Sequence, residues 1–305
     1  MSLLIGKSEN INNIRRLIKR AALSNGLPIF IFGESGTGKE LIAREICKEA
    51  NKNIFVPVNC GAIPRELLES ELFGYEKGSF TGASNSYKGK IRESHNGVLF
   101  LDEIGEMECY LQPKLLRVLQ EREVIPVGSS KSIKVDFLLI SATNRNITKM
   151  VENGDFREDL FYRLYGININ ILPLRDRKED ILPLCEFFLK NYSKKNNKQT
   201  LKLGNKLKEL IVKYNWPGNV RQLQSFIERE VFFSEPNNII LDHIPDFLVL
   251  NKAEENTDWN VFINEKIHIK KCLEFANWNI QKSSRLLGLS RATLYRKIKE
   301  YEIKK

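Results

Sequence analysis

The sequence predicts an α/β domain, a parallel sheet lying between helices, followed by a helical subdomain and an all-α helix-turn-helix. Three observations predict this class. Short apolar runs alternate with amphipathic segments over roughly the first 170 residues, the strand signal fades after Pro173, and the chain ends in a basic helical stretch. Strands of about four to six residues that alternate with helices are typical of a parallel sheet covered on both faces.

Individual elements follow from the same periodicities. Strands are predicted at 29–32, 55–58, 98–101 and 137–141. Helices are predicted at 41–50, 111–119, 181–192, 207–214 and 220–233, and helical periodicity from 259 to 303 is broken once, at Gly288. A polar stretch indicates a linker. We therefore expect an α/β core at 1–172, a helical lid at 173–250, a linker at 251–258 and a helix-turn-helix domain at 259–305.

Composition argues against several classes of protein. The chain is 42% hydrophobic and 28% charged, which is ordinary for a globular protein. No apolar run approaches the roughly 18 residues that span a bilayer, and no signal peptide is indicated. The five cysteines are scattered without a Cys-x-x-Cys pair, so we expect buried, inert thiols rather than disulfides or a zinc site. We expect a cytoplasmic protein with no membrane partner.

Basic charge is concentrated at the C-terminal end. Residues 251–305 hold 12 lysines and arginines against 7 acidic residues, a net charge of +5 out of the +10 of the whole chain. Excess basic charge on a helical module favours nucleic acid as its partner. A basic tail that only aids solubility is the alternative that composition leaves open.

A glycine-rich loop follows the first predicted strand and opens a helix. Its residues are Gly33, Glu34, Ser35, Gly36, Thr37, Gly38 and Lys39, with Glu40 next. Glycines let successive backbone N–H groups and the helix N-terminus face phosphate oxygens, and a lysine here neutralises the β- and γ-phosphates. The loop therefore predicts an ATP site. Residue 40 is glutamate where the general motif has the serine or threonine that holds Mg²⁺.

Two carboxylates follow the 98–101 run. In nucleotide hydrolases with such a loop the first carboxylate, here Asp102, holds Mg²⁺, and the second, Glu103, polarises the attacking water. Positive charge must also face the γ-phosphate. Arg157 and Arg163 are candidates, although single arginines are more often surface ion-pair partners. We therefore expect an ATPase that uses Mg²⁺.

The most specific segment is 71–83, Glu-Leu-Phe-Gly-Tyr-Glu-Lys-Gly-Ser-Phe-Thr-Gly-Ala. Here the chain resembles, over essentially its whole length, the sigma-54-dependent transcriptional activators, which are AAA+ P-loop NTPases. Their GAFTGA loop becomes GSFTGA, with Ser79 in place of alanine. The resemblance implies a sigma-54 contact through Gly78, Ser79, Phe80, Thr81, Gly82 and Ala83. Flanking glycines and an exposed Phe-Thr tip fit a mobile contact surface.

Other segments match the family in order. The resemblance implies that Asn59 restrains the catalytic glutamate, that Asn144 senses the γ-phosphate, and that Arg221 reaches the nucleotide from the lid. It also implies that Arg157 and Arg163 are arginine fingers for the ATP of a neighbouring subunit. A capping role for Asn59 and a surface ion pair for Arg221 remain open alternatives.

The departures from the family pattern are few. An acidic residue at Glu40 is usual in this family. Leu138 stands where the family commonly has arginine, and Gln222 stands where it has glutamate. Neither change removes a group that the chemistry requires, but both can tune the rate of hydrolysis or the coupling between subunits.

Residues 278–303 resemble the Fis-type helix-turn-helix that ends these activators. Ile280, Ser284 and Leu287 line one helical face, Gly288 permits the turn, and Leu294 faces the core. The side chains left for DNA are Ser290, Arg291, Thr293, Arg296, Lys297 and Lys299. An arginine and a threonine early in the second helix can contact base edges, and lysines can neutralise phosphates. A basic hairpin without DNA affinity is the alternative.

The resemblance implies an ATP-dependent activator that binds upstream enhancer DNA and remodels the closed complex of sigma-54 RNA polymerase into the open complex. It also implies assembly of identical subunits, from dimer to hexameric ring. Two alternatives are an AAA+ enzyme with another client, against which GSFTGA argues, and a DNA-binding regulator with a vestigial ATPase, against which the complete acids and arginines argue.

The family pattern begins at residues 4–8, Leu-Ile-Gly-Lys-Ser, with no receiver, PAS or GAF-like domain ahead of it. We therefore expect either regulation by a partner in trans or a longer native chain that carries its own sensor.

Overall fold

The computed structural model describes residues 4–24, 26–80, 83–199, 201–234, 240–241, 243–245, 248, 265–266, 268–270, 272–273, 276, 278–301 and 303. The chain divides into two units, Met1–His243 and Ile244–Lys305. The predicted linker at 251–258 lies outside the described residues, and the predicted domain boundaries stay predictions.

A five-stranded sheet organises the first unit. Its order is β2 (Phe55–Asn59), β3 (Val98–Asp102), β6 (Leu138–Thr143), β1 (Ile29–Phe32) and β7 (Ile167–Asn170). Every pair is parallel, with Ile29 opposite Ile140 on one side and Ile167 on the other. The predicted α/β class is therefore confirmed. The sequence did not indicate edge strand β7, because Asn168 and Asn170 interrupt its apolar run.

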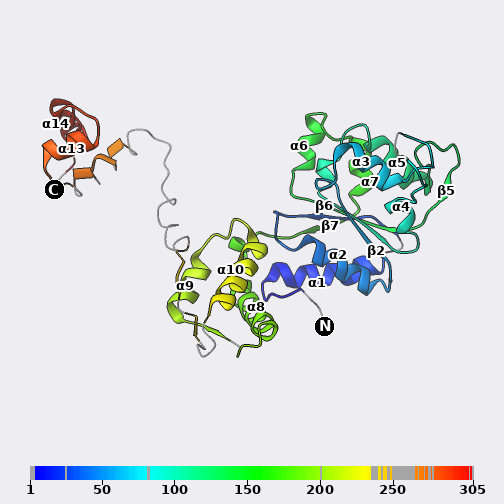
Figure 1. Ribbon diagram of the computed structural model, residues 1–305, viewed down its shortest axis with the longest axis horizontal. Helices are drawn as coiled ribbons and strands as arrows, with labels where there is room; N and C mark the ends of the chain where they lie inside the picture. Colours follow the sequence, from blue (N-terminus) through cyan, green and yellow to red (C-terminus); the bar gives the residue numbers. More distant parts are fainter. Residues whose placement is uncertain are drawn as a thin grey trace. The chain divides into compact units, whose positions relative to one another are not determined.

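Helices cover both faces of this sheet (Figure 1). One face carries α1 (Glu9–Ala22) and α2 (Lys39–Glu49), and the other carries α3 (Arg65–Phe73), α5 (Gln112–Glu121), α6 (Ile147–Glu152) and α7 (Glu158–Leu164), with the short α4 (Lys90–Glu93). Alternate residues of β3 serve the two cores: Phe100 packs with α1 and α2, and Leu101 packs with α3 and α5. Burying each such side chain contributes about 1.5–3 kcal/mol.

Two irregular segments connect these layers. The 3-10 helix η1 (Ile104–Glu106) follows β3 directly, and a short antiparallel hairpin, β4 (Glu123–Val124) with β5 (Ile133–Lys134), follows α5. Both lie between motifs that the sequence analysis singled out.

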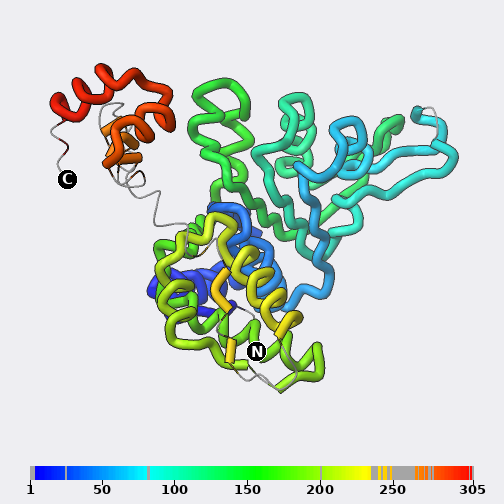
Figure 2. Tube along the Cα trace, turned by 60° about the vertical axis from the view of Figure 1, so that its left-hand side comes forward, coloured from blue at the N-terminus to red at the C-terminus, as the bar shows by residue number. Residues whose placement is uncertain are grey.

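The lid begins with 3-10 turns η2 (Leu174–Asp176) and η3 (Lys178–Asp180) and continues in α8 (Ile181–Lys195), α9 (Asn205–Lys213) and α10 (Asn219–Phe233). Figure 2 shows this bundle beside α1, where the buried carboxylate of Asp180 accepts hydrogen bonds from Lys7 N and Ser8 N. The helical lid also contains a short parallel strand pair that the sequence did not indicate, β8 (Lys202–Leu203) with β9 (Ile240–Leu241). Strands of two residues leave no periodic signature.

The second unit contains the predicted helix-turn-helix. Helices α13 (Ile280–Leu286) and α14 (Arg291–Glu300) are joined through Gly288, whose φ is +64°. Leu294 is fully buried in a cluster with Ile269 and Leu273, and Ile280 and Leu287 pack against it. A single break in the helical stretch was wrong, because a second one precedes α13, where Trp278 has φ +61°.

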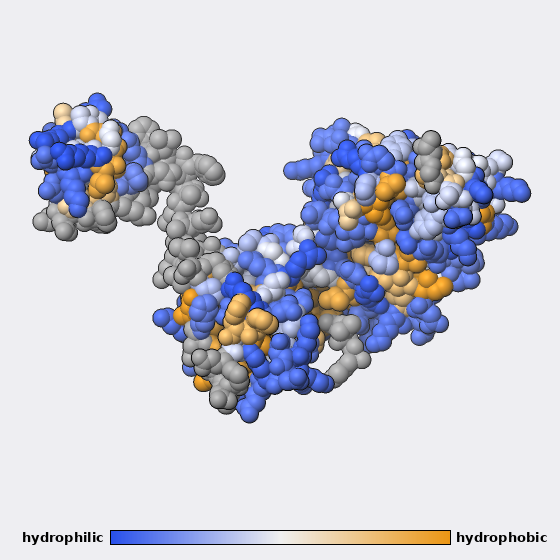
Figure 3. All heavy atoms as spheres, viewed as in Figure 1, coloured by the Kyte–Doolittle hydropathy of each residue, from blue (hydrophilic) through white to orange (hydrophobic). Residues whose placement is uncertain are grey.

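The face of the first unit seen in Figure 3 is largely hydrophilic, with apolar side chains gathered in a patch on its α/β part. Large apolar side chains that are exposed in this unit include Leu67, Phe80, Tyr110 and Tyr162. Within the described residues, no helix has the length and apolar character to cross a membrane.

Candidate active site

The loop between β1 and α2 is built for close approach of a ligand to the backbone. Gly36 and Gly38 have φ of +76° and +108°, a region in which residues with a side chain are strained. A Cβ on Gly33 would lie 2.4 Å from Ile171 Cγ2, and one on Gly36 would lie 2.5 Å from Gly218 O. Glycine is therefore required at both positions, and the loop opens α2, whose N-terminal end can face phosphate.

Lys39, the first residue of α2, and Glu103, which directly follows β3, meet at this loop. Lys39 Nζ donates to Gly33 O at 3.0 Å and lies 3.5 Å from Glu103 Oε1, and its side chain is only 6% exposed. The backbone N–H of Asn144 points at Glu103 Oε2, 3.4 Å away. Glu103 itself has φ +50°, a left-handed conformation that turns its carboxylate toward the loop. Three predicted site residues thus converge in space from β3, β6 and the loop.

Asp102 lies at the end of β3, where Glu103 N donates to its Oδ1 at 3.0 Å. Burial raises the pKa of Asp102, and the nearby Lys39 ammonium only partly opposes that shift. A partly buried carboxylate whose negative charge is only partly balanced by a neighbouring lysine is suited to binding a cation. Magnesium usually takes one or two carboxylates together with water and phosphate oxygens, so Asp102 fits the Mg²⁺ role that was predicted for it.

Asn59 lies beside Asp102 in the register of β2 and β3. Its Oδ1 accepts hydrogen bonds from Gly61 N and Ala62 N, both at 3.0 Å. In this structure the Asn59 side chain therefore caps the turn after β2, which is the alternative that the sequence left open. Restraint of Glu103 by Asn59 stays a prediction.

A group that the sequence did not single out ties the loop to the lid. Arg175 donates to Glu34 through both terminal nitrogens, at 2.9 and 2.5 Å, and Asn219 Nδ2 donates to Glu34 Oε2 at 3.1 Å and to Ser35 O at 3.0 Å. The hydrogen bonds from Arg175 hold the pKa of Glu34 below its usual value. Asn219 is fully buried in the left-handed region, with φ +51°, and its Oδ1 accepts from Leu174 N.

Two further arginines approach the loop from the lid. Arg221 is exposed, and its backbone N–H donates to Gly36 O at 3.2 Å, so its side chain is available beside the loop. Arg177 is 2% exposed and donates to Thr37 O at 3.0 Å. Burial lowers the pKa of Arg177. Glu40 faces solvent and pairs with Arg44 one turn along α2.

Arg157 is the N-cap of α7, and Arg163 lies within that helix. The Arg157 guanidinium is half exposed and pairs with Asp159, at 2.6 and 3.0 Å, while Arg163 Nη2 donates to Leu119 O at 2.8 Å. Across the part of the chain that the structure describes, neither arginine bonds to the loop 33–40. Their placement is compatible with a target outside their own nucleotide site.

The GSFTGA segment, residues 78–83, is called the signature loop below, and a backbone hydrogen bond closes its base. Gly78 N donates to Ala83 O at 2.9 Å, and Phe80 is 43% exposed while its ring stacks edge-on against Tyr75 at 5.0 Å. The Ser79 side chain lies against Gly128 of the β4–β5 connection, where a Cβ would meet it at 2.5 Å. The predicted contacts Thr81 and Gly82 lie outside the described residues.

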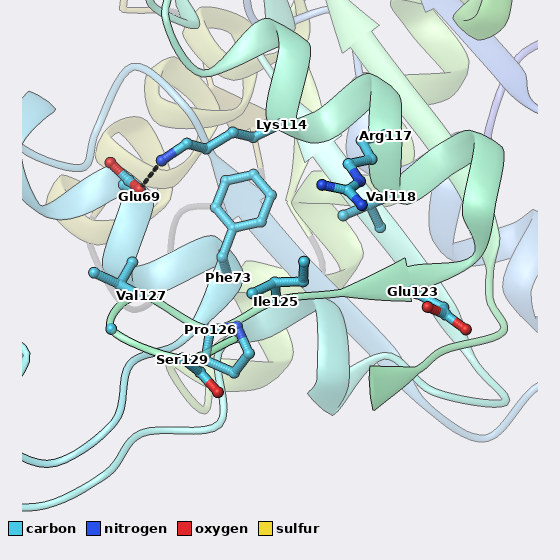
Figure 4. Close-up of a pocket in the computed structure, with 11 residues that line it drawn as sticks. Glu69, Phe73, Lys114, Arg117, Val118, Glu123, Ile125, Pro126, Val127 and Ser129 are labelled. Carbon is cyan, nitrogen blue, oxygen red and sulfur yellow. Dashed lines mark hydrogen bonds and ion pairs between the residues drawn. The ribbon is translucent and has the colours of Figure 1, made fainter. Parts of the chain in front are cut away.

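A cavity of about 350 Å³ lies between α3, α5 and the β4–β5 connection. Figure 4 shows Phe73 of α3 at its centre, with Lys114 and Arg117 of α5 above it and Pro126 below. Lys114 pairs with Glu69 across its rim. The connection that lines this cavity is the one that contacts Ser79, so helices and signature loop are joined through it.

In the second unit the six predicted DNA-binding side chains differ in availability. Arg291, Arg296 and Lys299 are exposed on α14. Ser290 caps this helix by accepting from Thr293 N at 3.1 Å, and the two hydroxyls lie 2.8 Å apart. Lys297 donates to Glu265 at 2.7 Å, and Tyr301 donates to the same carboxylate oxygen. Lys297 is therefore engaged within its own domain.

The cysteines match expectation only in part. Cys47, Cys60 and Cys185 are buried, and burial raises the pKa of Cys60 and Cys185 to about 12, so these thiols are inert near neutral pH. The expectation was wrong for Cys109, which is exposed because it lies in the turn between η1 and α5.

Three family descriptions match the chain in succession. They are the Sigma-54 interaction domain over residues 4–170, the AAA+ ATPase lid domain over 175–260, and the bacterial regulatory proteins of the Fis family over 264–301.

Named relatives agree with these matches. The chain is 43% identical over 310 residues to the signal-transduction and transcriptional-control protein of Clostridium beijerinckii, covering 99% of this chain and 49% of that protein. It is 43% identical over 288 residues to the regulatory protein AtoC of Escherichia coli K12, covering 90% of this chain and 62% of that protein. The chain thus spans less than two thirds of the length of these curated relatives.

A solved structure has the same fold. The crystal structure of NtrX from Brucella abortus in complex with ATP superposes with a TM-score of 0.74 at 34% identity, covering 99% of this chain and 70% of that one. The chain therefore belongs to the sigma-54-dependent transcriptional regulators, AAA+ proteins with a sigma-54 interaction domain and a Fis-type helix-turn-helix.

Proposed function

We propose that this chain hydrolyses ATP with Mg²⁺ and uses the energy to convert the closed complex of sigma-54 RNA polymerase into the open complex while bound to upstream enhancer DNA. The observation that carries the proposal is the convergence of Lys39, Glu103 and the Asn144 backbone on the phosphate-binding loop. The proposed partners, polymerase and DNA, place this activity in the bacterial cytoplasm.

Each residue of the site has a task in hydrolysis. The N–H groups of the loop and the Lys39 ammonium bind the β- and γ-phosphates, and Glu103 orients the water that attacks the γ-phosphorus and accepts its proton. Asp102 would hold Mg²⁺, which neutralises phosphate charge when bound. The Asn144 backbone holds the Glu103 carboxylate beside the place that the γ-phosphate occupies, so loss of that phosphate changes what the carboxylate contacts.

Completion of the site requires a neighbouring subunit in a ring, which we propose to be a hexamer. Arg157 and Arg163 have no bond to their own loop 33–40 among the described residues, and an arginine supplied in trans raises phosphoryl-transfer rates by about 10³–10⁵. The same helix exposes an aromatic face, with Tyr162 68% exposed and the following Tyr165 47% exposed. Exposed aromatic side chains beside functional arginines favour a protein contact surface.

In this proposal, the loop at 78–83 is the part of the ring that contacts sigma-54. An exposed phenylalanine at its tip is costly in water unless a partner covers it, and the Phe80 ring, 43% exposed, packs edge-on against Tyr75. We propose that Phe80 and Thr81 engage sigma-54 in a manner that depends on the nucleotide. The second unit holds DNA through Arg291, Arg296 and Lys299, with Ser290 and Thr293 fixing the start of α14.

Open-complex formation on a sigma-54 promoter with purified components tests this proposal. The Phe80→Ala variant should bind enhancer DNA and hydrolyse ATP at close to the wild-type rate, yet yield at least about tenfold less open complex, since the tip contact is removed. Leu67→Ala, which truncates another exposed apolar side chain of the same unit, is the matched control and should activate normally. Full activation by Phe80→Ala would refute the role of the loop.

A further inference from the structure

We infer that Gln112 is a positioning residue that holds Arg157 in place for the ATP of the neighbouring subunit. The inference rests on the proposed function, in which Arg157 acts in trans. Gln112 begins α5, its side chain is completely buried, and no part of the proposed chemistry uses it.

The side chain of Gln112 joins two segments that are far apart in the sequence. Its Oε1 accepts a hydrogen bond from the backbone N–H of Arg157 at 2.8 Å. Its Nε2 donates to Asp155 O at 3.3 Å and to Met107 O at 3.1 Å. One amide therefore fixes the backbone on both sides of residue 156 and ties it to the end of η1, the turn that follows Glu103.

This arrangement determines where the Arg157 guanidinium can reach. Arg157 is the N-cap of α7: its carbonyl oxygen accepts the first helical hydrogen bond, from Phe161 N at 3.1 Å, but its own N–H precedes the helix and donates to Gln112 instead. Its guanidinium pairs with Asp159 on the exposed surface. The hydrogen bond to Gln112 Oε1 therefore fixes the position of the Arg157 N–H. A displacement of about 1 Å in a group that positions reacting atoms can lower a rate by about 10²-fold.

The chemistry of the site favours a glutamine at this place. Gln112 Nε2 faces two carbonyl oxygens and, at 3.9 Å, the Cys109 sulfur, while its Oε1 faces one N–H. A neutral amide is the side chain that can donate to the former and accept from the latter at once. An apolar side chain in this buried place would leave these backbone groups without the hydrogen bonds that now fix their positions.

Steady-state kinetics can distinguish a role for Gln112 in positioning Arg157 from a purely structural role. In the Gln112→Met variant the volume is kept and the hydrogen bonds are lost. We expect kcat for ATP to fall on the order of 10- to 100-fold, while KM stays within about twofold because the loop 33–39 is untouched. Gln120→Met, at an exposed position of the same helix, should leave both constants unchanged.

The dependence on Arg157 is tested by a double-mutant cycle. If Gln112 acts through Arg157, the Gln112→Met/Arg157→Ala variant should have the same kcat as Arg157→Ala alone. Multiplication of the two losses, or a kcat for Gln112→Met within twofold of wild type, would overturn the inference. Thermal unfolding of each variant identifies misfolding, and Gln112→Ala, which leaves space rather than strain, replaces Gln112→Met if the latter does not assemble.

Mixed rings distinguish action in trans from action in cis. Lys39→Ala subunits cannot hydrolyse ATP but carry an intact Arg157, whereas Gln112→Met subunits carry an intact nucleotide loop. Mixing the two variants should raise hydrolysis above the sum of their separate rates, because some Gln112→Met sites then have a normal arginine opposite them. No gain on mixing would place the defect within the subunit's own site and refute the inference.

These measurements also separate the inference from the proposed function. A wild-type kcat for Arg157→Ala would remove the arginine from the proposed function whatever Gln112 does. A low kcat for Arg157→Ala beside a normal kcat for Gln112→Met would leave the proposed function standing and remove only the inference.

Discussion

Single residues around the phosphate loop are held by partners that lie far away in the sequence. Glu34 occupies a loop position that needs no side chain for phosphate binding, yet its carboxylate is bound by Arg175 and Asn219 of the lid. The loop and the lid are thereby joined through one charge. A change at the phosphates can be transmitted to the lid along these contacts.

The Glu34 carboxylate predicts a pH dependence. Because the hydrogen bonds from Arg175 lower the pKa of Glu34 from its ordinary value of 4.5, the folded state binds fewer protons here than the unfolded chain. The stabilisation is therefore fully present above that ordinary pKa and is lost as pH falls through the lower pKa of the folded state. Glu34→Gln should therefore lower the free energy of unfolding at pH 7, by no more than about 1 kcal/mol because half-exposed pairs are screened.

The measurement is thermal unfolding of wild type and Glu34→Gln at several pH values. The difference between them should stay constant from pH 7 to about pH 5 and shrink at lower pH, in accordance with the direction of the shift. A difference that grows as the solution is acidified would contradict the assignment. Glu9→Gln, a change at an exposed carboxylate in α1, is the control.

For single residues, the sequence predicts roles that depend on the local strand, loop and helix, and it misses roles that depend on tertiary contacts. Lys39, Asp102 and Glu103 were predicted because a strand, a loop and a helix place them by themselves. The roles of Arg175 and Asn219 depend on the lid folding back over the loop, which no spacing reveals. A weak signal existed for Asn219, since it follows Pro217-Gly218 within the segment that suggested Arg221.

At the scale of elements, the loop after β1 can be tested by adding one methyl group. Gly36→Ala places a Cβ 2.5 Å from Gly218 O and forces alanine to φ +76°. Loop and lid must separate, so we expect affinity for ATP to fall about tenfold or more, equivalent to at least about 1.4 kcal/mol. Titration with a fluorescent ATP analogue measures this.

Gly154→Ala is the matched control, because Gly154 has φ +79° and nothing within 4 Å of its Cβ position. It carries the same backbone strain, roughly 1–2 kcal/mol, without the collision. It should lower stability and leave affinity for ATP within about twofold. Equal losses of affinity in both variants would show that strain, not the contact with the lid, is responsible.

The second helix of the helix-turn-helix separates two lysines that the sequence treated alike. Lys299 is exposed, whereas Lys297 pairs with Glu265. Lys299→Ala should weaken DNA binding equally for all sequences and lower the slope of log K against log salt by about 1. Lys297→Ala should change that slope less and lower the stability of the second unit. Equal slopes for the two variants in fluorescence anisotropy would contradict this distinction.

Element prediction succeeded where apolar runs were continuous and failed where polar residues intervened. Strands β1, β2, β3 and β6 were found within two residues of their predicted bounds, because each has a nearly unbroken apolar sequence, although β2 lies at an edge of the sheet. Edge strand β7 and the two-residue strands of the lid carry too few apolar side chains to be recognised. The break at Trp278 was missed because tryptophan rarely adopts a positive φ.

At the scale of the whole molecule, the account requires more than one subunit. The nucleotide loop and the arginines lie on different parts of one chain, and Gln112 connects the arginine segment to the turn after Glu103. Each nucleotide site would thereby be linked to the next around the ring. Sequence motifs identified the participants, but the connection through a buried amide required the fold.

The most direct test of the central claim measures assembly and sigma-54 binding together. Light scattering coupled to gel filtration would be run on the protein with sigma-54 in ADP, in ATP and in ADP–aluminium fluoride. The account predicts a ring that retains sigma-54 with ADP–aluminium fluoride and releases it with ADP. A protein that stays monomeric with every nucleotide and never retains sigma-54 would contradict it.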